Sequence, residues 1–316
     1  MDSFGRFRRL SRTGRHSFFL PIRFRRLRIS LVPAALPILL AFLLPALAIP
    51  HFPPGAIQGS QSVPAYLGFD RNIYPGDTAI PILRKTFVFT GYWLSPPPGE
   101  KSNTWSGKRE LLRSQGFGFL VLYRGRDSSE LKSEAVAKRL GTEDAAGAAT
   151  SAKSEGFSNG TIIFLDVEEG GRLPANYHTY LRTWLDEVLK AGYRGGVYCS
   201  AIPVKEEANV TITTVEDIRA NTPSRDVAYW SYNDVCPPSP GCAFPKNPPL
   251  PSIGGASEAA VWQFAQSPRR KEYTSRCRAT YHRDGNCYAP GDSAHAWFLD
   301  VNSATSPDPS NGRKPE

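Results

Sequence analysis

The chain has 316 residues, of which 41% are hydrophobic, and a formal net charge of +9 at pH 7. The hydrophobic content is enough for a sizeable core, in two small domains or in one domain the size of a barrel. Residues 1–48 contain nine arginines, no lysine and one acid, so they carry +8 and residues 49–316 carry about +1. Because the positive charge belongs to the N-terminal segment, it does not indicate a nucleic-acid partner for the rest of the chain.

The N-terminal segment has the features of an export signal. An apolar run over residues 29–48 follows the arginines and ends in the small-x-small triplet Ala-Leu-Ala at 46–48, which predicts a signal peptide cleaved after this triplet. An uncleaved signal anchor is the alternative, since the run is nearly long enough to span a bilayer; membrane contact would then involve this segment only. Arg25 and Arg26 resemble a twin-arginine signal, although Arg28 stands where that pattern prefers an apolar residue. We expect an exported protein that is periplasmic, extracellular or associated with the cell wall.

After a linker rich in Pro, Gly, Ser and Gln at residues 49–64, short β-branched and aromatic runs predict strands. Eight such runs occur, at 65–70, 86–93, 118–125, 161–168, 195–200, 226–232, 259–266 and 296–302. Most are continuously apolar rather than alternating, as expected of strands that are buried on both faces.

Helical patterns separate the earlier strands. They lie at 77–85, 107–115, 129–140, 143–155 and 174–192, and strand–helix–strand spacing of this kind indicates parallel βαβ units. The later segments 233–258 and 267–295 lack helical periodicity. We therefore predict an α/β fold: a TIM-like (β/α) barrel of eight strands over residues 65–304, whose last strands lack covering helices, followed by a disordered tail over 305–316.

The five cysteines fit an exported protein. Cys236 and Cys242 flank a Pro-rich loop, and Cys277 and Cys287 flank a polar loop, so two local disulfides are the simplest pairing. Cys199 is left over in an apolar strand pattern, which is typical of a buried inert thiol; a nucleophilic cysteine is the alternative. No C-x-x-C spacing occurs and the histidines are scattered, so we expect no metal site and no cofactor.

Acidic side chains stand where several predicted strands end. In parallel barrels the carboxyl ends of the strands form the catalytic rim, and these ends carry Asp70, Asp166 with Glu168, and Asp300. The two-residue period of a strand places Asp166 and Glu168 on one face and Glu169 on the other. Coupling between neighbouring carboxyls raises one pKa, so that one acid stays protonated while the other stays ionised. Glycoside hydrolysis requires such a pair.

Single acids at strand ends also have structural interpretations. Asp70 precedes Arg71 and could form an ion pair with it, and Asp300 could form an Asx turn. The pair Asp166 and Glu168 is different, because two acids on one side of a buried strand need partners or a catalytic task.

Other strand ends carry aromatic and polar residues suited to a glycan. The candidate substrate-binding residues are Tyr92, Arg124, Tyr198, Trp230, Trp262 and Gln263. The aromatic rings could stack on sugar faces, or they could belong to the core. Arg124 could hold an anionic substituent, such as a muramic-acid lactyl carboxylate or a peptide carboxylate, or it could neutralise the acids.

These motifs, in this order, resemble a known family. They are GFD at 68–70, FLDVE at 164–168, GYRGGVY at 192–198, VWQF at 261–264 and LDVN at 299–302. The chain from about 65 to 302 resembles glycoside hydrolase family 25, the barrel lysozymes, and more closely the exported bacterial glycoside-hydrolase-like domains of unknown function related to it. The small-residue segment 141–156 is also similar to a helix of the second group. Two features depart from the pattern, namely the additional Glu169 and the long loop 95–107.

The resemblance implies roles for the acids and a substrate. Glu168 would be the general acid, Asp166 and Asp70 flanking carboxylates that assist it, and Asp300 a further carboxylate of the site. We expect an exported, muramidase-like glycoside hydrolase that acts on a cell-envelope glycan such as peptidoglycan. The alternative is a non-catalytic barrel that binds glycan or associates with the cell wall.

Overall fold

The computed structural model describes residues 64–207, 209–233, 247–266, 297 and 299–313. The chain divides into two units, Met1–Gln58 and Gly59–Glu316, and all described residues belong to the second. The predicted signal peptide, nearly all of the linker and the four cysteines of the predicted disulfides lie outside the described residues. Within the described ranges, no helix is both long enough and apolar enough to cross a bilayer.

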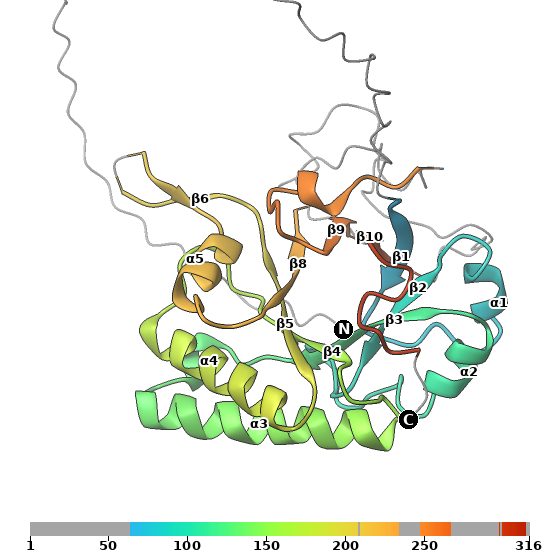
Figure 1. Cartoon of the computed structure of the whole chain (residues 1–316), viewed down its shortest axis with the longest axis horizontal. Helices are drawn as coiled ribbons and strands as arrows, with labels where there is room; N and C mark the ends of the chain where they lie inside the picture. The colour runs from blue at the N-terminus through green and yellow to red at the C-terminus, as the bar shows by residue number, and fades with distance from the viewer. Residues whose placement is uncertain (1–63, 208, 234–246, 267–296, 298, 314–316) are drawn as a thin grey trace, which may run out of the picture. The chain divides into compact units, whose positions relative to one another are not determined.

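Eight strands close into a barrel, which confirms the predicted fold class (Figure 1). They are β1 (Tyr66–Asp70), β2 (Phe89–Trp93), β3 (Gly118–Arg124), β4 (Ile162–Asp166), β5 (Arg194–Ser200), β8 (Ala228–Tyr232), β9 (Val261–Ala265) and β10 (Asp300–Ala304). Their order around the barrel follows the chain, and β10 closes the ring against β1. Each of the eight predicted runs contains one of these strands or overlaps it.

The last strand runs opposite to the others. The first seven barrel strands are parallel to one another, whereas β10 is antiparallel to both of its neighbours, β1 and β9. The sequence interpretation placed Asp300 near the end of a strand spanning 296–302, but β10 begins at Asp300. Because the strand is reversed, its first residue pairs with Asp70, the last residue of β1. Asp300 thus lies at the expected rim, although it is at the amino end of its strand.

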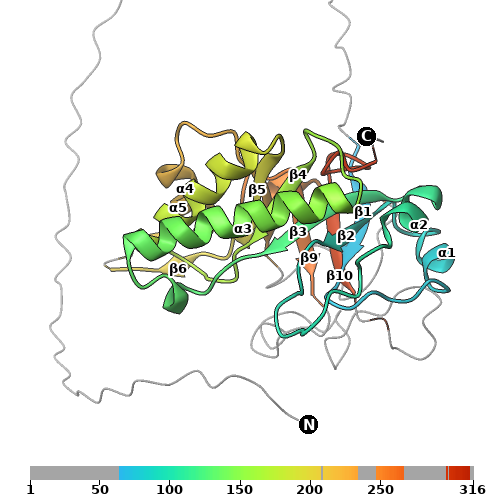
Figure 2. The ribbon, with the colours of Figure 1, turned by 90° about the horizontal axis from the view of Figure 1, so that it is seen from below.

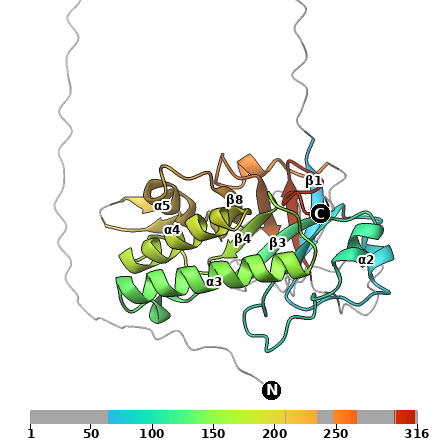
Figure 3. The ribbon, with the colours of Figure 1, turned by 60° about the horizontal axis from the view of Figure 1, so that its bottom comes forward.

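Helices cover part of the barrel. They are α1 (Ile80–Leu83), α2 (Arg109–Ser114), α3 (Glu134–Ser154), α4 (Ala175–Lys190) and α5 (Thr214–Asn221), with the 3₁₀ turns η1 (Ser128–Glu130) and η2 (Pro251–Ile253) and a hairpin of β6 (Val204–Lys205) and β7 (Thr211–Ile212). Figures 2 and 3 show α3 and α4 side by side along one flank of the barrel. In the described part of the connection between β8 and β9, the helical element is the single turn η2.

Two differences from the predicted helices have local causes. The patterns at 129–140 and 143–155 form one helix, α3, which continues through Gly141. A Cβ at Gly141 would lie 2.8 Å from the carbonyl oxygen of Tyr180, so glycine here permits the close packing of α3 on α4. The unpredicted helix α5 starts with a capping box, in which Thr213 and Glu216 satisfy each other's backbone N–H groups.

The barrel interior is filled by large rings. Phe164 and Trp230 meet edge to face inside it, with ring centroids 5.8 Å apart. A Cβ at Gly196 would lie 2.6 Å from the ring of Phe164, and one at Gly68 would lie 2.0 Å from the ring of Phe89. Small residues facing large ones therefore make the barrel a packed core with its functional surface at the rim.

Residues 305–313 correct the prediction of a disordered tail. They lie against the amino ends of β3 and β4, where the Ser310 hydroxyl accepts a hydrogen bond from the Val121 N–H (2.9 Å) and the Ser310 carbonyl accepts one from the Ile162 N–H (2.8 Å). The Asp308 carboxylate accepts a third, from the Phe119 N–H at 2.9 Å. These acceptors satisfy strand N–H groups that would otherwise be orphaned at this end of the barrel. The polar composition suggested disorder because it does not reveal such backbone partners.

Replacement of Ser310 tests this segment. Ser310 is fully buried, so Ser310→Ala leaves the Val121 N–H without an acceptor. We expect a loss of about 1–3 kcal/mol in the free energy of unfolding, measured by urea denaturation. Ser102→Ala, at an exposed position, is the control, and equal midpoints for the two variants would refute this role of the segment.

Candidate functional site

The acids meet at the rim formed by the carboxyl ends of the parallel strands and the amino end of β10. Asp70 and Asp166 are the last residues of β1 and β4, and Glu168 follows two residues after β4. Strand register aligns Arg124, Asp166 and Tyr198 across β3, β4 and β5. The charge of Glu168 acts on both Asp70 and Asp166, and that of Asp70 acts on Asp166. Asp70, Asp166 and Glu168 therefore form one electrostatically coupled cluster.

Asp70 is held by two amide side chains. Its Oδ1 accepts hydrogen bonds from Asn302 Nδ2 at 2.6 Å and from Gln263 Nε2 at 3.0 Å. Burial raises the pKa of Asp70 from its ordinary 3.8 to about 6; the two amide donors oppose the rise and the charge of Glu168 adds to it. Near neutral pH, Asp70 is thus mostly ionised but close to its titration range.

Other side chains fix the orientation of both amides. The indole Nε1–H of Trp230, which can only donate, points to Oδ1 of Asn302 at 2.9 Å and leaves the Asn302 NH₂ group to face Asp70. The Tyr198 hydroxyl donates to Oε1 of Gln263 at 2.8 Å. The donors on Asp70 are therefore preorganised from inside the barrel.

Asp166 and Glu168 share a side of the barrel but differ in exposure. Asp166 is 4% exposed, whereas Glu168 is exposed at the rim. Burial raises the pKa of Asp166 well above its ordinary range, and the charge of Glu168 and a hydrogen bond with it raise the pKa further, while Arg124 opposes the rise. Oδ2 of Asp166 is buried without a hydrogen-bond partner among the described residues. A protonated Asp166 that can share its proton with an exposed Glu168 follows from this environment.

The other two acids, Asp300 and Glu169, have contacts of their own. Asp300 stands opposite Asp70 in the strand register, and its charge contributes to raising the pKa of Tyr198, for which burial is the main cause. Glu169 points elsewhere: its carboxylate accepts hydrogen bonds from the backbone N–H and the hydroxyl of Ser128 in η1. Glu169 therefore stabilises the loop between β3 and α3.

Two candidate sugar-binding aromatics lie on the outside of the barrel. Tyr92 is fully buried, packs against Phe157 and donates from its hydroxyl to Glu155 at 2.5 Å. Trp262 packs beneath Gly254 and donates to the Asn233 carbonyl at 3.2 Å. Both predictions fail because alternate residues of a strand face opposite sides, and these two occupy the outward positions.

The remaining candidates face the barrel interior or the rim. Trp230 is fully buried and Tyr198 nearly so, and both act through Asn302 and Gln263 as described above. Their rings fill the barrel beneath the rim, so they are unsuited to the predicted sugar stacking. Arg124 is exposed at the rim.

Sequence reasoning did not assign Asn302 or Trp93 to the site. Asn302 follows Asp300 by two residues and so shares its face, which is a signal already present in the LDVN motif. Trp93 alternates with Tyr92 and lies almost buried at the end of β2, with its indole N–H donating to the Arg71 carbonyl at 3.2 Å.

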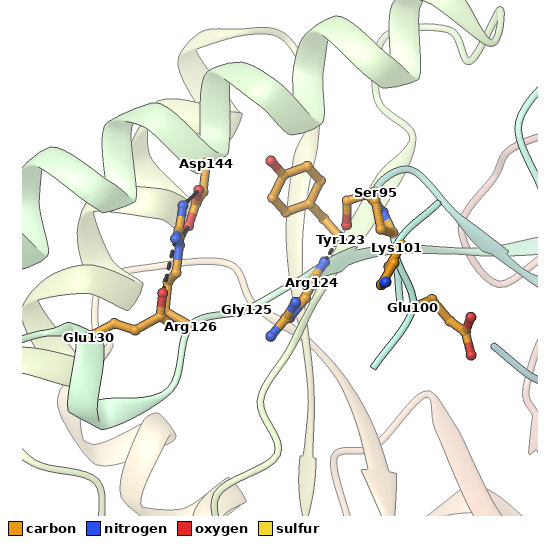
Figure 4. A pocket seen from close by; sticks show the side chains of 10 residues that line it. Ser95, Glu100, Lys101, Tyr123, Arg124, Gly125, Arg126, Glu130 and Asp144 are labelled. Atoms are coloured by element: carbon orange, nitrogen blue, oxygen red, sulfur yellow. Dashed lines mark hydrogen bonds and ion pairs between the residues drawn. The ribbon is translucent and has the colours of Figure 1, made fainter. Parts of the chain in front are cut away.

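One hollow adjoins the acid pair, and a second shares part of its lining. A small one of about 40 Å³ is lined by Asp166, Glu168 and Arg124 among others. A larger one of about 330 Å³ lies beside it, and its lining includes Arg124, Lys101 and Arg126 (Figure 4). Arg124 therefore borders both hollows.

The amide donors predict a change in the titration of Asp70. Asn302→Ala removes the shorter of the two hydrogen bonds that favour the ionised carboxylate, so the pKa of Asp70 should rise by roughly one pH unit or more. Carboxyl-carbon NMR titration measures this. Ser303→Ala, at the next and outward-facing position, is the control; an Asp70 that titrates at the parental pH in Asn302→Ala would contradict the network.

The raised pKa also predicts how stability depends on pH. Between pH values of about 4 and about 6 the folded state holds more protons at Asp70 than the unfolded state does, so stability falls as pH rises through this window. Asp70→Asn keeps an oxygen acceptor for both amides, and because the new side chain does not ionise, it removes this loss of stability. We expect the variant to gain about 1–3 kcal/mol in the free energy of unfolding at pH 7, measured by urea denaturation at pH 4 and pH 7. Asp226→Asn, at an exposed position, should lack this gain, and the same absence in Asp70→Asn would refute the assignment.

Comparison with known proteins gives structural neighbours of low sequence identity. An uncharacterized protein of B. stearothermophilus aligns with a TM-score of 0.48 and 18% identity, covering 76% of this chain and 95% of that one. The Tat-secreted protein Rv2525c of Mycobacterium tuberculosis, solved in complex with L-tartrate, gives 0.46 and 17%, covering 78% and 97%. The autolysin LytC of Streptococcus pneumoniae, solved with a synthetic peptidoglycan ligand, gives 0.43 and 14%, covering 76% and 46%.

A search of curated proteins found no match. The family model of the Rv2525c-like, glycoside hydrolase-like domain matches residues 92–274, which is more than half of the chain. This range contains the acid pair at the carboxyl end of β4 and six of the eight barrel strands, or parts of them. The chain therefore belongs to the Rv2525c-like family of glycoside hydrolase-like domains.

Proposed function

We propose that this protein is an exported glycoside hydrolase that cleaves a cell-envelope glycan, peptidoglycan, by carboxylate acid/base chemistry. The observation that carries the proposal is the pairing of a buried Asp166, whose pKa is raised well above its ordinary range, with an exposed Glu168 at the barrel rim. Two carboxyls with different environments are the requirement for this reaction.

Glu168 is the general acid in this proposal. Its carboxyl is exposed, so it can reach a glycosidic oxygen above the rim, and the hydrogen bond with Asp166 gives it a neighbouring source of a proton. Asp70, held by two amide donors, supplies negative charge next to the pair. Asp166 assists from beneath, and Asp300 is the further carboxylate at the rim.

The steps follow from these positions. Glu168 donates its proton to the glycosidic oxygen as the bond between that oxygen and the anomeric carbon breaks. The ionised carboxylate of the cluster stabilises the positive charge that develops on the sugar ring. Water then adds to the anomeric carbon, and the proton it releases returns to Glu168, which restores the starting state.

Export and the choice of glycan are supported by the N-terminal segment. The arginine-rich stretch followed by the apolar run 29–48 has the pattern of a signal peptide. An exported glycosidase meets the glycans of the cell envelope first, and peptidoglycan is the glycan that the resemblance to the barrel lysozymes implies.

A non-catalytic glycan-binding barrel is the second candidate. One observation favours it: the hollow directly over Asp166 and Glu168 measures about 40 Å³, whereas the neighbouring hollow measures about 330 Å³. A sugar residue would fit the larger hollow more readily than the one at the acids.

Adjacent glutamates provide a matched test. Glu168→Gln should lower the release of reducing ends from peptidoglycan at least ~100-fold, because it removes the proton donor. Glu169→Gln keeps an oxygen acceptor for Ser128 and should retain activity near that of the parent. The full chain and both variants are compared in a reducing-end assay.

The outcomes separate the two candidates. Equal release by the parent and Glu168→Gln would overturn the catalytic assignment. A parent that sediments with insoluble peptidoglycan but releases no reducing ends would instead support the binding barrel.

A further inference from the structure

The geometry points to a carboxylate-binding subsite next to the acid pair, formed by Arg124 and Lys101, which selects glycans that carry a carboxylate substituent near the cleaved bond. This inference rests on the proposed function and specifies its substrate. It is carried by a cavity and two unpaired cations.

The subsite is continuous with the acids. Arg124, Gly125 and Arg126 line both the large cavity of about 330 Å³ and the small hollow that contains Asp166 and Glu168. A group bonded to a sugar at the acid pair therefore enters the larger cavity along Arg124. A substituent of a few heavy atoms fits this volume.

One wall of the cavity is already neutralised by its own contacts. Arg126 forms two hydrogen bonds with the Asp144 carboxylate, at 2.8 and 2.7 Å, and one with Glu130 at 3.1 Å. The Tyr180 hydroxyl donates to Asp144 as well, at 2.8 Å. Each nitrogen of the Arg126 guanidinium thus makes a hydrogen bond and its charge is balanced by Asp144 and Glu130, so this wall gives shape to the cavity and supplies no free cation.

Arg124 and Lys101 are different. Both are exposed, and within the described part of the chain neither the guanidinium nor the ammonium group has a hydrogen bond or ion pair. The backbone N–H of Arg124 donates to the Ser95 hydroxyl at 2.9 Å, which fixes the end of β3 from which its side chain extends. Figure 4 shows this side chain directed away from α3, whereas that of the preceding Tyr123 points toward it. Both cations are therefore available to a ligand in the cavity.

The surrounding charges favour an anion of low charge. Glu100 and Glu130 line the same cavity, and they would repel a dianion such as a phosphate monoester more than a carboxylate. A carboxylate also matches the planar guanidinium fork of Arg124 in two parallel hydrogen bonds, with Lys101 as a second point charge.

The test compares substrates that differ in carboxylate content. Oligomers of N-acetylglucosamine carry none, peptidoglycan strands freed of their peptides carry only lactyl carboxylates, and intact peptidoglycan carries lactyl and peptide carboxylates. For Lys101→Gln and Arg124→Gln, we expect the ratio of kcat/KM on carboxylated substrate to kcat/KM on the neutral oligomer to fall about 10- to 100-fold. The ratio is needed because Arg124 also lowers the pKa of Asp166. Loss of that effect changes kcat/KM on both substrates and cancels in the ratio.

A matched control removes the same charge elsewhere. Lys85 is exposed and follows α1, at the opposite end of the barrel from the rim. Lys85→Gln should leave the ratio unchanged. A fall on stripped strands identifies the lactyl group as the ligand, and a fall on intact peptidoglycan alone identifies the peptide carboxylate.

Failure of this inference is distinguishable from failure of the proposed function. Cleavage of glycan by the parent, with an unchanged ratio in both variants, overturns the subsite and leaves the hydrolase standing. If the parent cleaves no glycan, binding is measured instead, by calorimetry with the Glu168→Gln protein. The subsite is supported if this protein binds carboxylated strands but not the neutral oligomer, and if adding Lys101→Gln weakens that binding. Equal binding of both glycans, or binding of neither, overturns it.

Discussion

The antiparallel pairing of β10 with β1 and β9 is the constraint on which the rest of this structure depends. It closes the barrel, and it brings Asp300 and Asn302 to the rim that the parallel strands reach with their carboxyl ends. The reversed direction also leads the chain to the opposite end of the barrel, where Ser310 and Asp308 satisfy the backbone of β3 and β4. One strand thus completes both ends of the barrel.

The acid cluster is held together at a cost in stability. Burial and mutual repulsion make ionised carboxylates unfavourable at Asp70 and Asp166, and their raised pKa values are the expression of this cost. At Asp70, the amide donors offset part of this cost without adding a charge. At Asp166, the positive charge of Arg124 offsets part of it. A cluster made only for stability would have no need of such groups, since neutral side chains of the same shape would be more stable.

Much of this fold could be predicted because long continuous apolar runs identify buried strands. Errors arose where a shift of one residue along a strand decides whether a side chain faces the barrel interior. Tyr92 and Trp262 face outward, whereas their neighbours Trp93 and Gln263 face inward. The direction of β10 could not be predicted from the local sequence pattern, because an apolar run does not show which way its strand runs in the sheet. The large cavity could not be predicted either, since its lining comes from segments whose proximity depends on the tertiary fold.

The hydrogen bond between Asn302 and Asp70 joins residues 232 positions apart in the chain. Bringing together residues so far apart costs more chain entropy than closing a short loop, which slows the folding of such topologies. During synthesis, Asp70 is made near the start of the domain and Asn302 near its end, so the carboxylate has no oriented amide from β10 until almost the whole domain has been made. Assembly of the acid site is therefore a late event of folding, and a chain that stops before β10 would contain every acid of β1 and β4 and still lack the site.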